Sequence, residues 1–141
     1  MTFFNIQGID MKAVFFAVVA GLAFIAPAFS QSTKSQAPVP VCAGPDDCEA
    51  MWIDSQEVIQ LAVQMKIRIS SANRIETFTD RTFGMTGVVT KYPMGADAYE
   101  MRAQILCRNE LACADLRPSA VNMFNGLVNN YADYRKSKSI K

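Results

Sequence analysis

The side chains best suited to chemistry are four cysteines, which form two pairs with identical spacing. Cys42 and Cys48 read C-x5-C, and so do Cys107 and Cys113. Thiol oxidoreductases use C-x2-C, and four-thiolate zinc sites use C-x2-C or C-x4-C pairs. The spacing therefore favours structural disulfides, and we expect no metal or other cofactor. Sequence alone leaves three connectivities open; we favour the local pair within each C-x5-C over the crossed pairings, which would tie the start of the domain to its end.

Acid–base catalysis has few candidates, because the chain contains no histidine. A hydrolase would then depend on tuned carboxylates, lysine, tyrosine or cysteine. Asp54 and Glu57 stand three residues apart in a predicted helix, where two carboxylates can reach one spot and serve as acid and base. The same spacing is typical of an exposed acidic helix face. Glu76 and Asp80 are likewise expected to face solvent, so we predict no catalytic residue and keep the Asp54 and Glu57 hydrolase as an alternative.

Aromatic side chains offer a binding surface instead. Phe83 and Tyr92 flank loops at one end of a predicted strand over residues 85–92, and aromatic residues on loop rims can form contact surfaces. Most aromatic residues of so small a domain are expected in its core.

The first 30 residues are typical of a secretory signal peptide. Lys12 gives a positive start, and the 17 residues Ala13–Phe29 are uncharged and mostly apolar. Ala28 and Ser30 are the small residues expected before a cut between Ser30 and Gln31. A spanning helix needs about 20 apolar residues, so we expect cleavage rather than a stable membrane anchor.

Two further observations bear on export. Residues 1–10 carry Asp10 and no positive side chain, so the true start is expected at Met11. All four cysteines follow the predicted cut, and an even number of cysteines in a short exported chain indicates disulfides. We therefore predict a periplasmic or secreted protein.

The charge balance is nearly neutral. The chain has 14 Lys and Arg against 13 Asp and Glu, and removing residues 1–30 leaves 13 and 12. Nucleic-acid binders usually carry a clear basic excess, so no nucleic acid is expected as partner. The end of the chain carries a basic cluster of Arg135, Lys136, Lys138 and Lys141. Such a cluster is typical of a helix C-terminus, or it could contact an anionic envelope surface.

The chain divides into a signal peptide (1–30), a flexible linker (31–41), a single domain (42–135) and a basic tail (136–141). The linker reads QSTKSQAPVPV, which has few large apolar residues and two prolines. The domain is long enough for one core but not for two.

Apolar periodicity predicts the elements of this domain. A helix begins at Pro45 and runs to about Met65, because apolar residues recur every three or four positions. Period-two patterns and turn residues then predict strands near residues 67–70, 75–79, 85–92 and 99–107, and a last helix begins at Pro118 after a loop over 108–116. Hairpin-linked strands between two helices predict a two-layer α+β fold, with an antiparallel meander of about four short strands and both helices on one face.

Three short features resemble a group of small exported proteobacterial proteins: Cys48-x3-Trp52 near a helix start, Ile75-Glu76-Thr77 on a strand, and the Cys107 and Cys113 pair after the last strand. The resemblance covers roughly residues 47–131. It implies a periplasmic α+β domain and transfers no catalytic residue.

The sequence therefore predicts a small exported disulfide-containing protein that acts as an interaction or accessory module for an envelope or secreted protein. Sheet edges offer such a module one docking mode. The alternatives are an envelope-surface binding protein that uses the basic C-terminus, and the hydrolase with Asp54 and Glu57.

Overall fold

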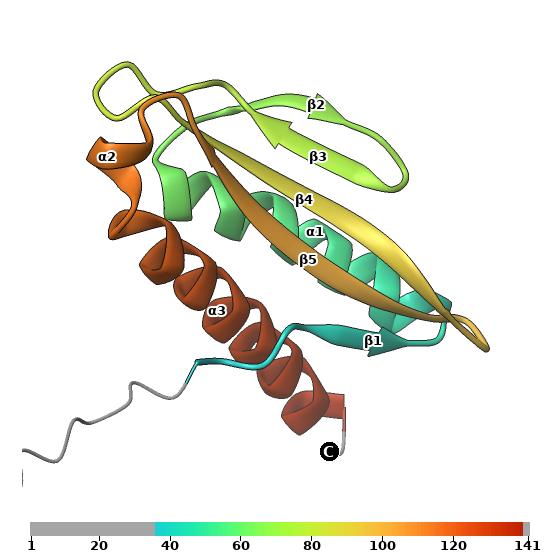
Figure 1. Ribbon diagram of the computed structural model, residues 1–141. Coiled ribbons are helices and arrows are strands. Elements are labelled where there is room, and N and C mark those ends of the chain that lie inside the picture. Colours follow the sequence, from blue (N-terminus) through green and yellow to red (C-terminus); the bar gives the residue numbers. More distant parts are fainter. Residues whose placement is uncertain (1–35, 140–141) are drawn as a thin grey trace, which may run out of the picture. The chain divides into compact units, whose positions relative to one another are not determined.

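The structure is a computed structural model and describes residues 36–139 (Figure 1). The predicted signal peptide, its cleavage site and the start at Met11 lie outside the described residues. In chain order the elements are β1 (Val41–Ala43), α1 (Pro45–Val63), β2 (Ile67–Ser70), β3 (Arg74–Thr77), β4 (Met85–Gly95), β5 (Ala98–Cys107), α2 (Glu110–Cys113) and α3 (Leu116–Ser139).

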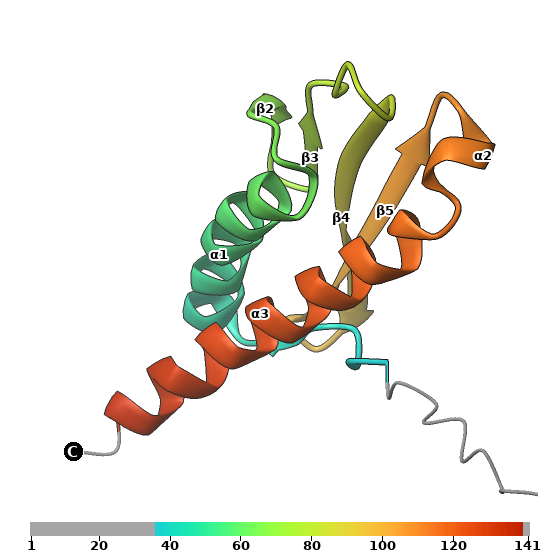
Figure 2. The same ribbon diagram turned by 90° about the vertical axis from the view of Figure 1, so that its left-hand side faces the viewer.

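One antiparallel sheet with the strand order β1-β5-β4-β3-β2 forms the first layer, and the helices form the second (Figure 1, Figure 2). β2 to β5 are the meander that the sequence predicts. α1 packs on β4, and α3 packs on β5 and on α1, so both long helices cover the same face of the sheet. The two-layer α+β fold is thus confirmed, with β1 as a fifth strand beyond the expected four.

α1 begins at a proline and ends at a residue in the left-handed region. Pro45 suits the first turn, and the Asp47 carboxylate accepts a hydrogen bond from the backbone N–H of Ala43 (3.2 Å). Gln64 adopts a φ of 56°, so the helix stops at Val63, slightly short of the expected Met65. The buried positions recur at helical spacing and are Cys48, Met51, Trp52, Ser55, Val58, Ile59 and Val63.

At position 87 of β4, the contact with α1 leaves room for no residue larger than glycine. A Cβ built on Gly87 would lie 2.7 Å from Cγ1 and 2.9 Å from Cδ1 of Ile59. The backbone N–H of Gly87 donates to Oγ1 of Thr77, a buried hydroxyl on β3 (2.9 Å). The glycine therefore allows the helix to lie directly on the centre of the sheet.

The described part of the predicted linker lies along α3. The Asn122 side chain accepts a hydrogen bond from the backbone N–H of Ala37 (2.6 Å), and the side-chain amide of Asn125 donates to the carbonyl of Ala37 (3.1 Å). The amide of Asn129 donates to the carbonyl of Pro38 (2.8 Å). Asparagine side chains thus satisfy a backbone whose composition alone is typical of a flexible linker.

The same segment then joins the sheet. Pro40 is fully buried, and its carbonyl accepts a hydrogen bond from the backbone N–H of Met101 (2.9 Å). β1 follows directly and pairs with the outer edge of β5. Residues 36–41 of the predicted linker, together with Cys42 and Ala43, thus form a segment held against α3 and β5, which we call the strap.

Both disulfides join cysteines of the same C-x5-C pair, as the sequence favours. Cys42–Cys48 ties the strap to the first turn of α1, and Cys107–Cys113 ties the end of β5 to α2. Cys42 pairs in register with Tyr99, near the start of β5. The two disulfides thus lie near opposite ends of the same strand.

Several boundaries differ from the predicted ones. β3 ends at Thr77, whereas β4 continues to Gly95, where a two-residue turn follows with positive φ at Ala96 and Asp97. The predicted loop over 108–116 contains α2, whose first turn is capped by Asn109. α3 begins at Leu116, before the expected Pro118, and includes residues 136–139 of the predicted basic tail.

The sheet face away from the helices carries charged side chains that pair with one another. Glu76 forms ion pairs with Arg68 and Arg74, and Glu100 forms one with Arg102 (2.6 Å). The Glu76 side chain is only 15% exposed, which corrects the expectation that it simply faces solvent. Val88, which pairs with Glu76 across the strands, is buried on this face.

Candidate functional site

An open cavity of about 960 Å³ lies between the C-terminal end of α1, the loop over residues 78–84 and the first half of α3. Three buried side chains line it, one from each of α1, β4 and α3: Val63, Met85 and Ala120. Large apolar side chains that water still reaches line it too, namely Leu61, Phe78, Phe83, Leu116 and Met123. We call this cavity the apolar pocket.

The exposure of the lining side chains distinguishes this pocket from a gap in the core. Leu61 is 52% and Phe78 is 50% exposed, although each has buried neighbours in the same cavity. Single exposed apolar residues are ordinary on protein surfaces. Five around one cavity form a concave apolar surface, which is the usual form of a binding site.

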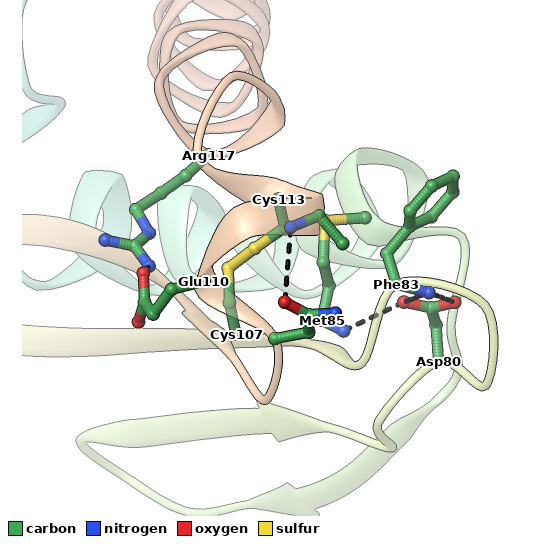
Figure 3. The surroundings of a disulfide bond; sticks show 9 residues. Asp80, Phe83, Met85, Cys107, Glu110, Cys113 and Arg117 are labelled. Carbon is green, nitrogen blue, oxygen red and sulfur yellow. Dashed lines mark hydrogen bonds and ion pairs between the residues drawn. A yellow bond between two sulfur atoms is a disulfide. The ribbon is translucent and has the colours of Figure 1, made fainter.

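The loop at one side of the pocket is shaped by Asp80. Its carboxylate accepts hydrogen bonds from the backbone N–H groups of Thr82 (2.7 Å), Phe83 (3.0 Å) and Met85 (2.8 Å), as the close-up in Figure 3 shows for Phe83 and Met85. The backbone N–H of Asp80 in turn donates to the carbonyl of Met85 (2.8 Å). These bonds fold the loop back on itself and fix the position of Phe83 at the pocket.

These contacts also set the charge state of Asp80. Partial burial alone would raise the pKa of its carboxyl, but the backbone N–H donors of Met85, Phe83 and Thr82 together outweigh it and hold the pKa below the ordinary value. Asp80 is therefore a charged structural anchor of the loop, which corrects the expectation that it merely faces solvent.

The Cys107–Cys113 disulfide lies close to this loop (Figure 3). Cys107 pairs in register with Met85, whose side chain lines the pocket, and Cys113 is fully buried. An ion pair between Glu110 and Arg117 further links α2 to the first turns of α3. The disulfide and the ion pair thus help to place the start of α3, one wall of the pocket, against β4 and β5.

The two carboxylates considered for catalysis lie elsewhere. Asp54 forms an ion pair with Arg135, which joins α1 to the last part of α3, and Glu57 is exposed. Neither side chain lines the apolar pocket. The hydrolase with Asp54 and Glu57 therefore finds no support in the apolar pocket.

The same ion pair bears on the basic C-terminus. Arg135 is engaged by Asp54, and the Lys138 ammonium lies 4.9 Å from the centre of the Tyr134 ring. Lys141 lies outside the described residues. Of this basic cluster, the described range leaves Lys136 and Lys138 to contact an anionic surface, which is fewer cations than the sequence suggests.

The two aromatic residues considered for binding are far apart along β4. Phe83 precedes the strand and lines the apolar pocket, whereas Tyr92 lies near its other end, with the Arg102 guanidinium 4.8 Å from the ring centre. The expectation that they flank the same end is wrong. β4 is longer than expected, and Tyr92 lies within the strand rather than on a loop.

The pocket itself was not foreseen from the sequence, although a signal for it exists. Leu61 and Met123 lie outside the apolar stripes of the two predicted helices, and Leu116 falls in the predicted loop over 108–116. Apolar residues outside a buried stripe indicate a second apolar surface. Their convergence depends on how α1 and α3 cross, which periodicity does not determine.

Comparison of the chain with protein-family models, with curated proteins and with solved structures gave no match. The resemblance to small exported proteobacterial proteins therefore stays a prediction. No helix within residues 36–139 is both long and apolar enough to cross a membrane.

Proposed function

We propose that this chain is an exported, non-catalytic binding module that holds an apolar segment of an envelope or secreted protein in the apolar pocket. The carrying observation is the cluster of exposed Leu61, Phe78, Phe83, Leu116 and Met123 around one cavity of about 960 Å³. Fully burying a large apolar side chain contributes roughly 1.5–3 kcal/mol. These five side chains are 39–52% exposed, so a partner that covers several of them gains a part of that free energy from each.

Export is supported by the predicted signal peptide and by the two disulfides, which persist in oxidising compartments. We propose cleavage near Ser30 and Gln31, which leaves a protein in the periplasm or the medium. Intact mass measurement of the protein recovered from these fractions tests this part. A chain that begins at Gln31 is the expected result, and an uncleaved chain that stays in the cytoplasm would refute it.

The binding surface is tested by affinity capture from an envelope extract of the protein's host. Leu61→Glu places a charge in the pocket at a position that is 52% exposed, so the fold should tolerate it. Ile53→Glu is the matched control, since Ile53 is 59% exposed on the same helix and does not line the pocket.

We expect one partner that binds the natural chain and the Ile53→Glu variant saturably. Its affinity for the Leu61→Glu variant should be lower by at least about tenfold, because binding would bury a charge in an apolar contact. A partner that binds all three proteins equally would place the interface elsewhere. Capture of no protein at all would refute the proposed function.

A further inference from the structure

A second, smaller cavity adjoins the apolar pocket on the same loop. Its volume is about 380 Å³, and Arg108 and Asn109 line it together with residues 79–84. Arg81 lines both cavities. Arg81 therefore lies where an occupant of the apolar pocket would continue into the smaller cavity.

The arginines of this region differ from the others in the described range. Arg81 and Arg108 form no ion pair with any residue of 36–139, whereas the remaining arginines there all do: Arg68, Arg74, Arg102, Arg117 and Arg135. Both unpaired arginines line the smaller cavity. Their coincidence at one site points to an anionic group that they would share.

The one acidic residue that lines either cavity does not supply this anion. Both carboxylate oxygens of Asp80 accept hydrogen bonds from the backbone N–H groups of the loop. Its charge is thus directed into the loop rather than toward Arg81 or Arg108. Two cations against one internally satisfied anion leave the end of the pocket positively charged.

We infer that the occupant of the apolar pocket carries a carboxylate next to its apolar group, and that Arg81 and Arg108 bind this carboxylate. This inference rests on the proposed function, and it makes the partner segment an apolar one that bears an acidic side chain or the free C-terminus. Guanidinium groups match carboxylates because their N–H donors form paired hydrogen bonds.

Three eight-carbon probes isolate the two parts of this recognition: octanoate, octan-1-ol and octylammonium. Each has eight carbons in an unbranched chain, and they differ chiefly in the charge of the head group. The full chain, labelled with ¹³C at the methionine methyl groups, reports where they bind. Met65, Met85 and Met123 line the pocket, whereas Met51, Met94 and Met101 do not, so each spectrum contains its own control.

We expect octanoate to shift the signals of the pocket methionines selectively and to bind about tenfold more tightly than octylammonium, with octan-1-ol between them. In the Arg81→Gln, Arg108→Gln double variant, all three probes should bind within about twofold of each other because the cations are gone. Arg68→Gln, on the far face of the sheet, should retain the preference for octanoate.

Three outcomes overturn the inference, and they are distinguishable. Equal binding of the three probes to the natural chain would show an apolar pocket without carboxylate recognition, and the proposed function would stand. A preference for octanoate that survives in the double variant would assign it to other groups. If no probe shifts the pocket methionines, both the inference and the proposed use of the pocket fail.

Discussion

Two carboxylates, Glu76 and Asp80, combine structural roles with a measurable charge state. Hydrogen bonding to Arg68 is the largest influence that lowers the pKa of Glu76 from its ordinary value of 4.5, and Arg74 adds to it. Asp80 is lowered from 3.8 because the loop N–H donors together outweigh its desolvation. Both groups thus bind a proton less readily in the folded chain than in the unfolded chain.

This difference predicts an acid-labile fold. Because the unfolded chain binds more protons, the stabilisation from Glu76 and Asp80 is complete above pH 4.5 and is lost as the pH falls through their lower folded pKa values. Glu76→Gln should destabilise the protein by about 1 kcal/mol at pH 7 and make the acid transition shallower. Urea unfolding measured between pH 7 and pH 2.5 tests this expectation.

The matched control is Glu57→Gln on the exposed face of α1, which should change the free energy of unfolding at pH 7 by less than about 0.5 kcal/mol. A Glu76→Gln variant with the same stability and the same acid transition as the natural chain would show that the ion pairs on the open sheet face contribute nothing.

At the scale of elements, two glycines predict opposite effects of the same substitution. Gly87→Ala places a Cβ 2.7 Å from Ile59 at the contact of α1 with β4, so it should destabilise the fold by about 1–3 kcal/mol. Gly126 lies inside α3, and a Cβ there meets only Ala37, at 3.8 Å, an ordinary contact. Gly126→Ala should stabilise the protein by about 0.5–1 kcal/mol through helix propensity.

Thermal and urea unfolding of the two variants measure these changes. A Cβ at position 126 faces the strap rather than the sheet, because Ala37 is its neighbour within 4 Å. If Gly126→Ala destabilises the fold as much as Gly87→Ala does, then the strap lies closer to α3 than the 3.8 Å between Ala37 and a Cβ at position 126 indicates.

The elements also show what the sequence can and cannot predict. Strict alternation from Tyr99 to Cys107 predicted the buried and exposed faces of β5, because a period of two leaves no other face for Met101 and Ile105. The strap was missed because Pro40 and Val41 are held by partners distant in sequence. Asn122, Asn125 and Asn129 share one face of α3 and were the only sign that a backbone segment binds there.

At the scale of the whole molecule, the two disulfides should act independently. Each closes a loop between cysteines six residues apart in sequence, and the loops lie near opposite ends of β5. Chain entropy then predicts a loss of about 2–3 kcal/mol for each double Cys→Ala variant, and the two losses should add because the sites are distant.

Urea unfolding of the two double variants and of the quadruple variant under non-reducing conditions tests this additivity. A quadruple variant that loses much more stability than the sum would show that the strap and α2 are coupled through the core. The spacing of the cysteines favours local pairing. It does not show that Cys107–Cys113 helps to place a wall of the pocket, because that depends on Met85 lying opposite Cys107 in the sheet.

The pocket is likewise a property of the whole fold. Leu61, Phe83 and Met123 come from α1, the loop before β4 and α3, and no local pattern shows that they converge. The sequence shows Asp54 and Glu57 as two acidic residues close together on a helix. It does not show that Asp54 pairs with Arg135, because Arg135 is 81 residues away. The sequence therefore identifies residues that could bind or react, but only the structure shows which residues they contact.

Site-specific photo-crosslinking in living host cells is the most direct test of the binding role. A photoreactive phenylalanine derivative replaces Leu61 in the pocket or Ile53 outside it, both on α1 and both more than half exposed. We predict one discrete protein adduct from position 61 and none from position 53. Adducts of equal yield from both positions, or none from position 61, would contradict the assignment of the apolar pocket as the binding site.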